Sequence, residues 1–250
     1  MESAVNAAGP GPGATPSKRD DVIDALMKLA ADRPWNDIEL ADIAEAAKIS
    51  LAELRDLFPS KGAVLGAFSR RIDREVLEGT TDDLAGEPAR ERIFDVMMRR
   101  LDALTPYKRA LRRITFALRQ DPLSLAALNR SALNAMRYML AAARISTEGP
   151  LGGLKLQGAV IVFSNTMQIW LDDDDPALAR TMARLDRELR RGGRVLERAE
   201  EIRSFMAPFR ALGKALLGRR RRRGPQRRRA RFEDEARFEN EDGSDPAAAI

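Results

Sequence analysis

The stretch ISLAELRDLFPSK, residues 49–61, constrains the fold of this chain more than any other segment. Ser50, with Glu53 three residues later, forms the pattern of a capping box, in which each side chain accepts a hydrogen bond from the other residue's backbone amide at a helix start. We therefore expect a short helix that ends near Phe58. Pro59-Ser60 then predicts the start of another helix, because the amide proton that proline lacks has no helical partner there.

Apolar residues recur at helical spacing through most of the chain, beginning with a segment that Ser17 can cap. No stretch shows the alternation typical of a strand, so the sequence predicts an all-α fold. The helices are expected at about residues 18–32, 40–47, 51–58, 60–78, 88–104, 106–120, 122–145, 154–171 and 176–191. In the second of these, the residues expected to face inward are Leu40, Ile43, Ala44 and Ala47.

The composition argues against several kinds of chemistry. The 250 residues include no cysteine and no histidine, so the chain lacks thiol chemistry, the usual general base and the commonest metal ligand. We also find no pattern that would place a base beside a nucleophile. The prediction is a protein that is not an enzyme and has no catalytic residue, no metal and no cofactor.

Residues 20–68 resemble the tetracycline-repressor (TetR) family of transcriptional regulators. The resemblance rests on Asp42-Ile43-Ala44-x-x-Ala47, Ile49-Ser50 and Leu54-x-x-x-Phe58-x-Ser60-Lys61-x-x-x-Leu65. It implies a TetR-like fold, with an N-terminal three-helix helix-turn-helix domain and an all-helical ligand-binding and dimerisation domain. It also implies a homodimer built on the last two core helices, whose helix over 51–57 enters the major groove of double-stranded DNA. The implied DNA-binding residues are Lys48, Ser50, Leu51, Ala52, Arg55 and Lys61, the last at a helix start suited to phosphate.

The segment expected to face DNA is nevertheless acidic. Residues 36–56 contain six acids against Lys48 and Arg55, and Lys48 replaces the glycine usual at the family's turn. Affinity for DNA comes largely from neutralising phosphates. Each phosphate contact adds roughly −0.9 to the slope of the logarithm of the binding constant against the logarithm of the salt concentration. Three explanations keep DNA binding open: Glu53 is committed to its capping box, Asp42 and Glu45 can point to solvent away from the groove, and an acid on a reading helix can accept a hydrogen bond from cytosine N4.

A second resemblance lies in the C-terminal half. Ile169-Trp170-Leu171-Asp172-Asp173-Asp174-Asp175-Pro176, followed by Thr181-Met182-Ala183-x-Leu185-Asp186-Arg187-x-Leu189, is similar to the lipid-binding accessory protein of coenzyme Q (ubiquinone) biosynthesis. This resemblance implies a TetR fold without DNA binding, an isoprenoid lipid ligand and docking on a membrane. The acidic run has another explanation, because acids at the first turn of a helix interact favourably with its dipole.

The segment RSFMAPFRALGKALLGRRRRR, residues 203–223, combines apolar residues at helical spacing with a run of arginines. Such a helix is a candidate for an anionic membrane surface. Two alternatives remain: the helix packs back on the dimer, or its arginines supply phosphate contacts. The residues expected to contact the membrane or an anion are Phe205, Phe209, Leu212, Leu216, Arg219, Arg220, Arg221, Arg222 and Arg223.

The middle helices are expected to enclose a pocket for an apolar or amphipathic ligand. Core packing is the alternative explanation for each of its residues. The residues expected to line the pocket are Met97, Met98, Phe116, Met136, Met139, Phe163, Asn165, Met167, Gln168 and Trp170, with Tyr138 nearby.

We therefore expect a TetR-like, ligand-responsive regulator that binds operator DNA as a homodimer. The alternative is a lipid-binding, membrane-peripheral accessory protein of ubiquinone biosynthesis. No run of 18 uninterrupted apolar residues occurs, so a cytoplasmic location is expected, at the inner membrane surface in the alternative. The expected organisation is a disordered leader over 1–17, a helix-turn-helix domain over 18–66, a ligand-binding and dimerisation domain over 67–200, an amphipathic helix over 201–218 and a charged, disordered tail over 219–250.

Overall fold

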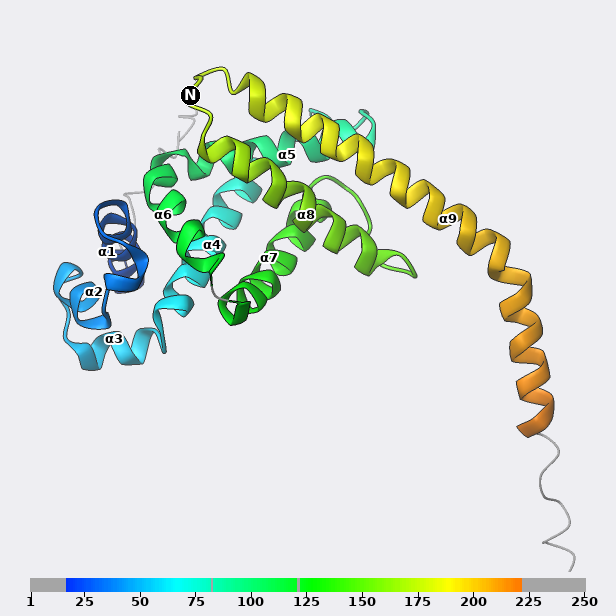
Figure 1. The fold of residues 1–250 in the computed structure, drawn as a ribbon, viewed down its shortest axis with the longest axis horizontal. Helices are drawn as coiled ribbons and strands as arrows, with labels where there is room; N and C mark the ends of the chain where they lie inside the picture. The colour runs from blue at the N-terminus through cyan, green and yellow to red at the C-terminus, as the bar shows by residue number, and fades with distance from the viewer. Residues whose placement is uncertain (1–16, 82, 121, 222–250) are drawn as a thin grey trace, which may run out of the picture. The chain divides into compact units, whose positions relative to one another are not determined.

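The computed structural model describes residues 17–81, 83–120 and 122–221, and all regular structure within them is helical. The prediction of an all-α fold is therefore confirmed (Figure 1). Two short 3₁₀ helices lie at Trp35–Asp37 and Thr105–Tyr107. The α-helices are α1 (Lys18–Asp32), α2 (Leu40–Ala46), α3 (Leu51–Leu57), α4 (Lys61–Glu78), α5 (Ala89–Leu104), α6 (Lys108–Leu118), α7 (Pro122–Ala142), α8 (Gly152–Leu171) and α9 (Ala179–Arg221).

The chain divides into two compact units between residues 197 and 198. The first unit contains α1 to α8 and the beginning of α9, and all packing and sites below belong to it. In the second unit, the described residues continue α9 as far as Arg221. Among the described helices we find none that combines the length and hydrophobicity needed to cross a lipid bilayer.

Serine side chains mark the starts of three N-terminal helices, as predicted. The Asp20 amide donates to Ser17 Oγ at 3.4 Å, and the Ala63 amide donates to Ser60 Oγ at 3.1 Å. The capping box of α3 is confirmed: the Glu53 amide donates to Ser50 Oγ at 3.2 Å, and the Ser50 amide donates to Glu53 Oε2 at 2.9 Å. These bonds satisfy amides that a helix start would otherwise leave unpaired.

Lys48 lies in the turn between α2 and α3 with a φ of 57°, in the left-handed region that favours glycine. A lysine there is uncommon but sterically allowed. The turn conformation that the family's glycine would supply is thus present despite the substitution. Three backbone hydrogen bonds close the turn: the Ala47 amide donates to the Ile43 carbonyl, the Lys48 amide to the Glu45 carbonyl, and the Ile49 amide to the Ala44 carbonyl.

A continuous hydrophobic core holds α1, α2, α3 and α4 together. Ile43, Leu54 and Phe58 are buried in it, so both short helices are anchored by one apolar side. Leu40 was expected to face inward, but it is 42% exposed, and that prediction is wrong. Leu40 is the first residue of a seven-residue helix, in which Ile43 and Ala44 already supply the inward face.

Beyond these helices, α4 packs against α1, α5 and α7, while α6 packs against α1 and α8 packs against α7 (Figure 1). The helix predicted over 106–120 is a 3₁₀ turn followed by α6, and the one predicted to end near residue 191 continues as α9 through Gly192-Gly193. Glycine lowers helix propensity by about 1 kcal/mol relative to alanine, which weakens a helix without ending it.

Candidate functional site

The exposed face of α3 is the first candidate site. Leu54 is buried and anchors the helix, whereas Leu51 is 56% exposed, and Ala52, Arg55 and Asp56 are also exposed. The helix therefore presents an apolar start, one guanidinium and one carboxylate to solvent. Ser50 and Lys48, predicted to contact DNA, are exposed at the edge of the same helix.

Glu53 is committed to the fold of this unit. Besides its capping box, its carboxylate accepts a hydrogen bond from Lys18 Nζ at 2.7 Å, across from α1. The Lys18 hydrogen bond, then those from the Ser50 amide and hydroxyl, lower the pKa of Glu53 to about 2. The carboxylate is therefore charged at every physiological pH, and a neighbouring ammonium compensates its charge.

Asp42 plays the same part at the start of α2, where it also belongs to a capping box and pairs with a base. Its carboxylate accepts from the Glu39 amide at 2.8 Å and lies 3.1 Å from the Arg33 guanidinium. The Glu39 amide, followed by Arg33, lowers the pKa of Asp42. Compensation is incomplete over the unit as a whole, because residues 18–66 contain ten acids and seven bases.

Lys61, predicted to contact phosphate, is partly buried at the start of α4. Its ammonium donates to the carbonyls of Trp35 and Ile38, each at 2.7 Å, and lies 4.6 Å from the Trp35 ring centroid. Burial is the main cause that lowers the pKa of Lys61. An ammonium has three donors, so these carbonyls leave one for an anion. Lys61 thus joins the 3₁₀ turn to α4, whatever else it binds.

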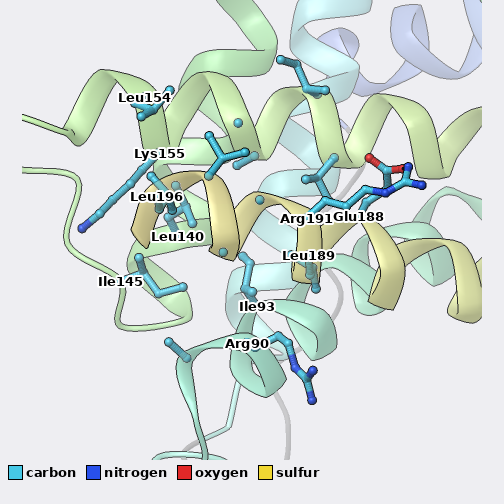
Figure 2. Close-up of a pocket in the computed structure, with 18 of the residues that line it drawn as sticks. Arg90, Ile93, Leu140, Ile145, Leu154, Lys155, Glu188, Leu189, Arg191 and Leu196 are labelled. Atoms are coloured by element: carbon cyan, nitrogen blue, oxygen red, sulfur yellow. The ribbon is translucent and has the colours of Figure 1, made fainter. Parts of the chain in front are cut away.

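The second candidate site is a cavity of about 590 Å³ between α5, the end of α7, α8 and α9 (Figure 2). This volume lies in the range of roughly 300–1,000 Å³ typical of small-molecule sites. Three helical glycines, Gly158, Gly192 and Gly193, also line it and leave room in it. Its apolar walls include Ile93, Met97, Leu140, Ile145, Val162 and Leu196.

The cavity has charged groups on separate sides (Figure 2). The guanidinium of Arg191 pairs with Glu188 at 3.1 Å, and Asn165 Nδ2 donates to the same carboxylate at 3.2 Å. The guanidinium of Arg90 pairs with Glu91 at 2.5 Å. Lys155 Nζ donates to the Ser146 carbonyl at 3.0 Å and, among the described residues, pairs with no carboxylate.

Of the residues predicted to line a pocket, the cavity includes Met97 alone. Met136, Met139, Phe163 and Trp170 are buried in the core instead. Asn165 binds Glu188, Met98 and Met167 are half-buried, and Gln168 is exposed. Phe116 is 70% exposed, and Tyr138 is exposed as well. The sequence signal that was missed is the set of glycines, which create space by lacking side chains.

The acidic run before α9 is built into the fold. Asp173 is buried, and its carboxylate accepts from the Thr181 amide at 3.0 Å and the Thr181 hydroxyl at 2.6 Å. The Thr181 hydroxyl is the main cause that lowers the pKa of Asp173. Lys108 and Arg112 of α6 donate to the carbonyls of Asp173 and Leu171. These contacts support the explanation that the acids serve the helix start.

The residues predicted to contact a membrane lie in the C-terminal part of α9 and beyond its end. The side chains of Phe205, Phe209, Leu212, Leu216, Arg219, Arg220 and Arg221 lie outside the described residues, although α9 includes their backbone, and Arg222 and Arg223 lie outside them altogether. In the described part of the chain, no three acidic side chains converge into a metal site.

The chain has the fold of TetR-family transcriptional regulators, as solved structures show. A TetR transcriptional regulator from Nitrosomonas europaea is 23% identical, with a TM-score of 0.56 over 70% of this chain and 97% of that one. A TetR transcriptional regulator from Rhodococcus sp. RHA1 is 17% identical, with a TM-score of 0.51 over 70% and 94%. No protein-family model and no curated protein matches the sequence. The predicted TetR-like architecture is therefore confirmed at the level of the fold.

Proposed function

We propose that this protein is a ligand-responsive transcriptional regulator that binds operator DNA as a homodimer in the cytoplasm. The observation that carries the proposal is the α2–turn–α3 geometry. Lys48 keeps the left-handed turn, Leu54 anchors α3, and the opposite face of α3 is free to enter a major groove. Glu53, which would repel phosphate, is compensated by Lys18.

Homodimer formation through α8 and α9 is supported by their exposed apolar side chains. Ile161 of α8 is 51% exposed and Val195 of α9 is 53% exposed, with Met182 exposed on the same helix. Clustered apolar surface of this kind favours association. Because Ile161 and Val195 also line the cavity, a second copy would cover part of its rim. The two α3 helices of a dimer must lie about 34–36 Å apart, or a multiple of that, to reach successive major grooves.

A ligand in the cavity would change the distance between the two α3 helices of the dimer through helices that pack against one another. Ile93 and Met97 of α5 line the cavity, and Arg100 of the same helix pairs with Asp73 of α4. Helix α4 in turn packs against α1 of the helix-turn-helix unit. A ligand that binds one arrangement of these helices more tightly shifts the population toward it.

The test is selection of genomic fragments by the full-length protein at low salt, followed by measurement of affinity for the enriched site. We expect a palindrome, and Arg55→Ala is expected to lower specific affinity by about tenfold or more, as loss of one base-edge contact does. Arg74→Ala removes an equally exposed charge from α4 and serves as the matched control. If no site is enriched, or if both variants behave alike, α3 is not a DNA-reading helix.

The second candidate function is the lipid-binding accessory role at the inner membrane surface. It is favoured by the excess of acids over 18–66, which weakens attraction to DNA, and by the apolar cavity. The protein should then float with anionic liposomes, and a variant without residues 203–231 should not. Flotation unaffected by that deletion, together with an enriched operator, would refute the accessory role.

A further inference from the structure

We propose that the cavity between α5, α8 and α9 binds an amphipathic organic anion, with its apolar chain against α8 and its acidic group at Lys155. This inference rests on the proposed function, because the anion would be the effector of the regulator.

The space for a chain is made by glycines rather than by a gap in packing. A Cβ atom at Gly158 of α8 or at Gly193 of α9 would meet nothing within 4 Å, and at Gly192 it would reach only the Val162 side chain at 3.8 Å. Alanine is the better helix former at such positions. Each glycine therefore leaves open a volume that a larger residue could fill without a clash.

The sign of the ligand's charge follows from the groups at the wall. The charged residues of the described lining are Arg90, Lys155, Arg191 and Glu188. Arg191 is paired with Glu188 and Arg90 lies beside Glu91 and Asp186, so Lys155 carries the one uncompensated charge of this lining, and that charge is positive. An apolar cavity with this excess strengthens attraction for an anion and disfavours a cation, because charges interact more strongly away from bulk water. A neutral apolar compound would gain nothing from these groups.

The position of the ligand's acidic group follows from which positively charged side chain of the lining lacks a carboxylate partner. Arg191 is paired with Glu188, and Arg90 is paired with Glu91. Among the residues that the structure describes, Lys155 donates to the Ser146 carbonyl alone, so its ammonium keeps further donors for a carboxylate. In Figure 2, Lys155 lies at one end of the cavity, beside Leu196, with its ammonium directed outward at the rim, and the Glu188–Arg191 pair lies at the opposite end. A ligand whose carboxylate binds Lys155 would thus have the apolar wall of the cavity available for its hydrocarbon chain.

Calorimetry on the full-length protein, without DNA, tests the charge preference with three probes that share a twelve-carbon chain: dodecanoate, dodecanol and dodecyltrimethylammonium. We expect dodecanoate to bind most tightly. Lys155→Met should weaken dodecanoate binding about ten- to hundredfold, in the range of one charge-assisted hydrogen bond, and leave dodecanol binding unchanged. Lys28→Met, an exposed lysine on α1, should change neither. Equal or tighter binding of the ammonium probe would overturn the proposal.

Gly158→Leu tests the location, with Gly153→Leu as its matched control. Both glycines lie in α8 with nothing within 4 Å of an added Cβ, but only Gly158 lines the cavity. Gly158→Leu should abolish dodecanoate binding while the helical circular dichroism and its melting persist, and Gly153→Leu should bind normally. Equal binding by both variants would refute the site. These measurements contain no DNA, so they do not depend on whether the protein binds an operator. Failure to bind dodecanoate would refute this inference, and failure to enrich an operator would refute the proposed function.

Discussion

Of the ion pairs that the structure describes, the one between Asp73 and Arg100 should be the most costly to break. It joins α4, which begins beside the helix-turn-helix unit, to α5, which lines the cavity. Arg100 also donates to Ser69 Oγ at 3.2 Å and lies 5.5 Å from the Phe163 ring centroid. Its Nε atom is buried without a partner, so the guanidinium depends on few acceptors. Asp73→Asn removes the counter-charge and preserves the shape.

The exposed fractions of the two side chains determine how much stability Asp73→Asn should lose. The side chain of Arg100 is 7% exposed and that of Asp73 is 13% exposed, so little water replaces the lost carboxylate. Removing one partner of a buried pair costs about 3–5 kcal/mol, and the asparagine oxygen retains one acceptor, so we expect a loss of about 2–3 kcal/mol. For a chain of this size, that loss lowers the melting temperature by about 5–10 °C.

Urea unfolding followed by circular dichroism measures this loss. Asp32→Asn is the matched control, because the Arg109–Asp32 pair, at 3.3 Å, has side chains that are 69% and 71% exposed. Such surface pairs contribute about 0–1 kcal/mol. If Asp73→Asn costs no more than Asp32→Asn, the buried guanidinium does not require its counter-charge. The double variant Asp73→Leu with Arg100→Met should recover stability relative to Asp73→Asn, since no unpaired charge remains.

Two further predictions concern helix starts. The pKa of Glu53 is lowered from 4.5 to about 2 in the folded protein, so its stabilising contribution is complete above about pH 4.5 and is lost as the pH falls through about 2. The stability difference between the wild type and Glu53→Gln, measured by urea unfolding, should therefore be constant above pH 4.5 and shrink below it; a difference that grows on acidification contradicts this sign. Asp173→Ala should expose the start of α9, and hydrogen exchange of the Thr181 amide should accelerate several-fold, whereas unchanged exchange would show that Asp173 does not cap the helix.

The helix starts could be predicted from sequence because their determinants are local. Ser17, Ser50 and Ser60 each accept a hydrogen bond from an amide three residues later, and that spacing is visible in the sequence. The end of the last helix was harder to predict. Gly192-Gly193 resembles a stop but only reduces helix propensity, and packing against α8 can outweigh a local preference.

The cavity could not be predicted, and the reason is geometric. Helical spacing identifies apolar faces, but it does not tell which side chains meet a neighbour and which face a void. Met136, Met139 and Trp170 are apolar and mid-chain, as a ligand wall requires, yet neighbouring helices cover them completely. Gly158, Gly192 and Gly193 line the cavity and leave space in it, and glycines do not stand out in a pattern of apolar side chains. Glycines within amphipathic helices are the signal that could have located it.

The net charge of residues 36–56 overstates the negative charge that this part of the surface carries, because bases from outside the segment lie beside two of its acids. Counting residues 36–56 alone places Glu53 against DNA without compensation, but Lys18 lies 35 residues earlier in the chain and 2.7 Å away in space. Asp42 is likewise compensated by Arg33, which lies outside that segment. The remaining electrostatic obstacle on α3 is therefore Asp56, which is exposed beside Arg55. An aspartate there can either repel phosphate or accept from a cytosine N4, so the base preference of the selected operator decides between repulsion and recognition.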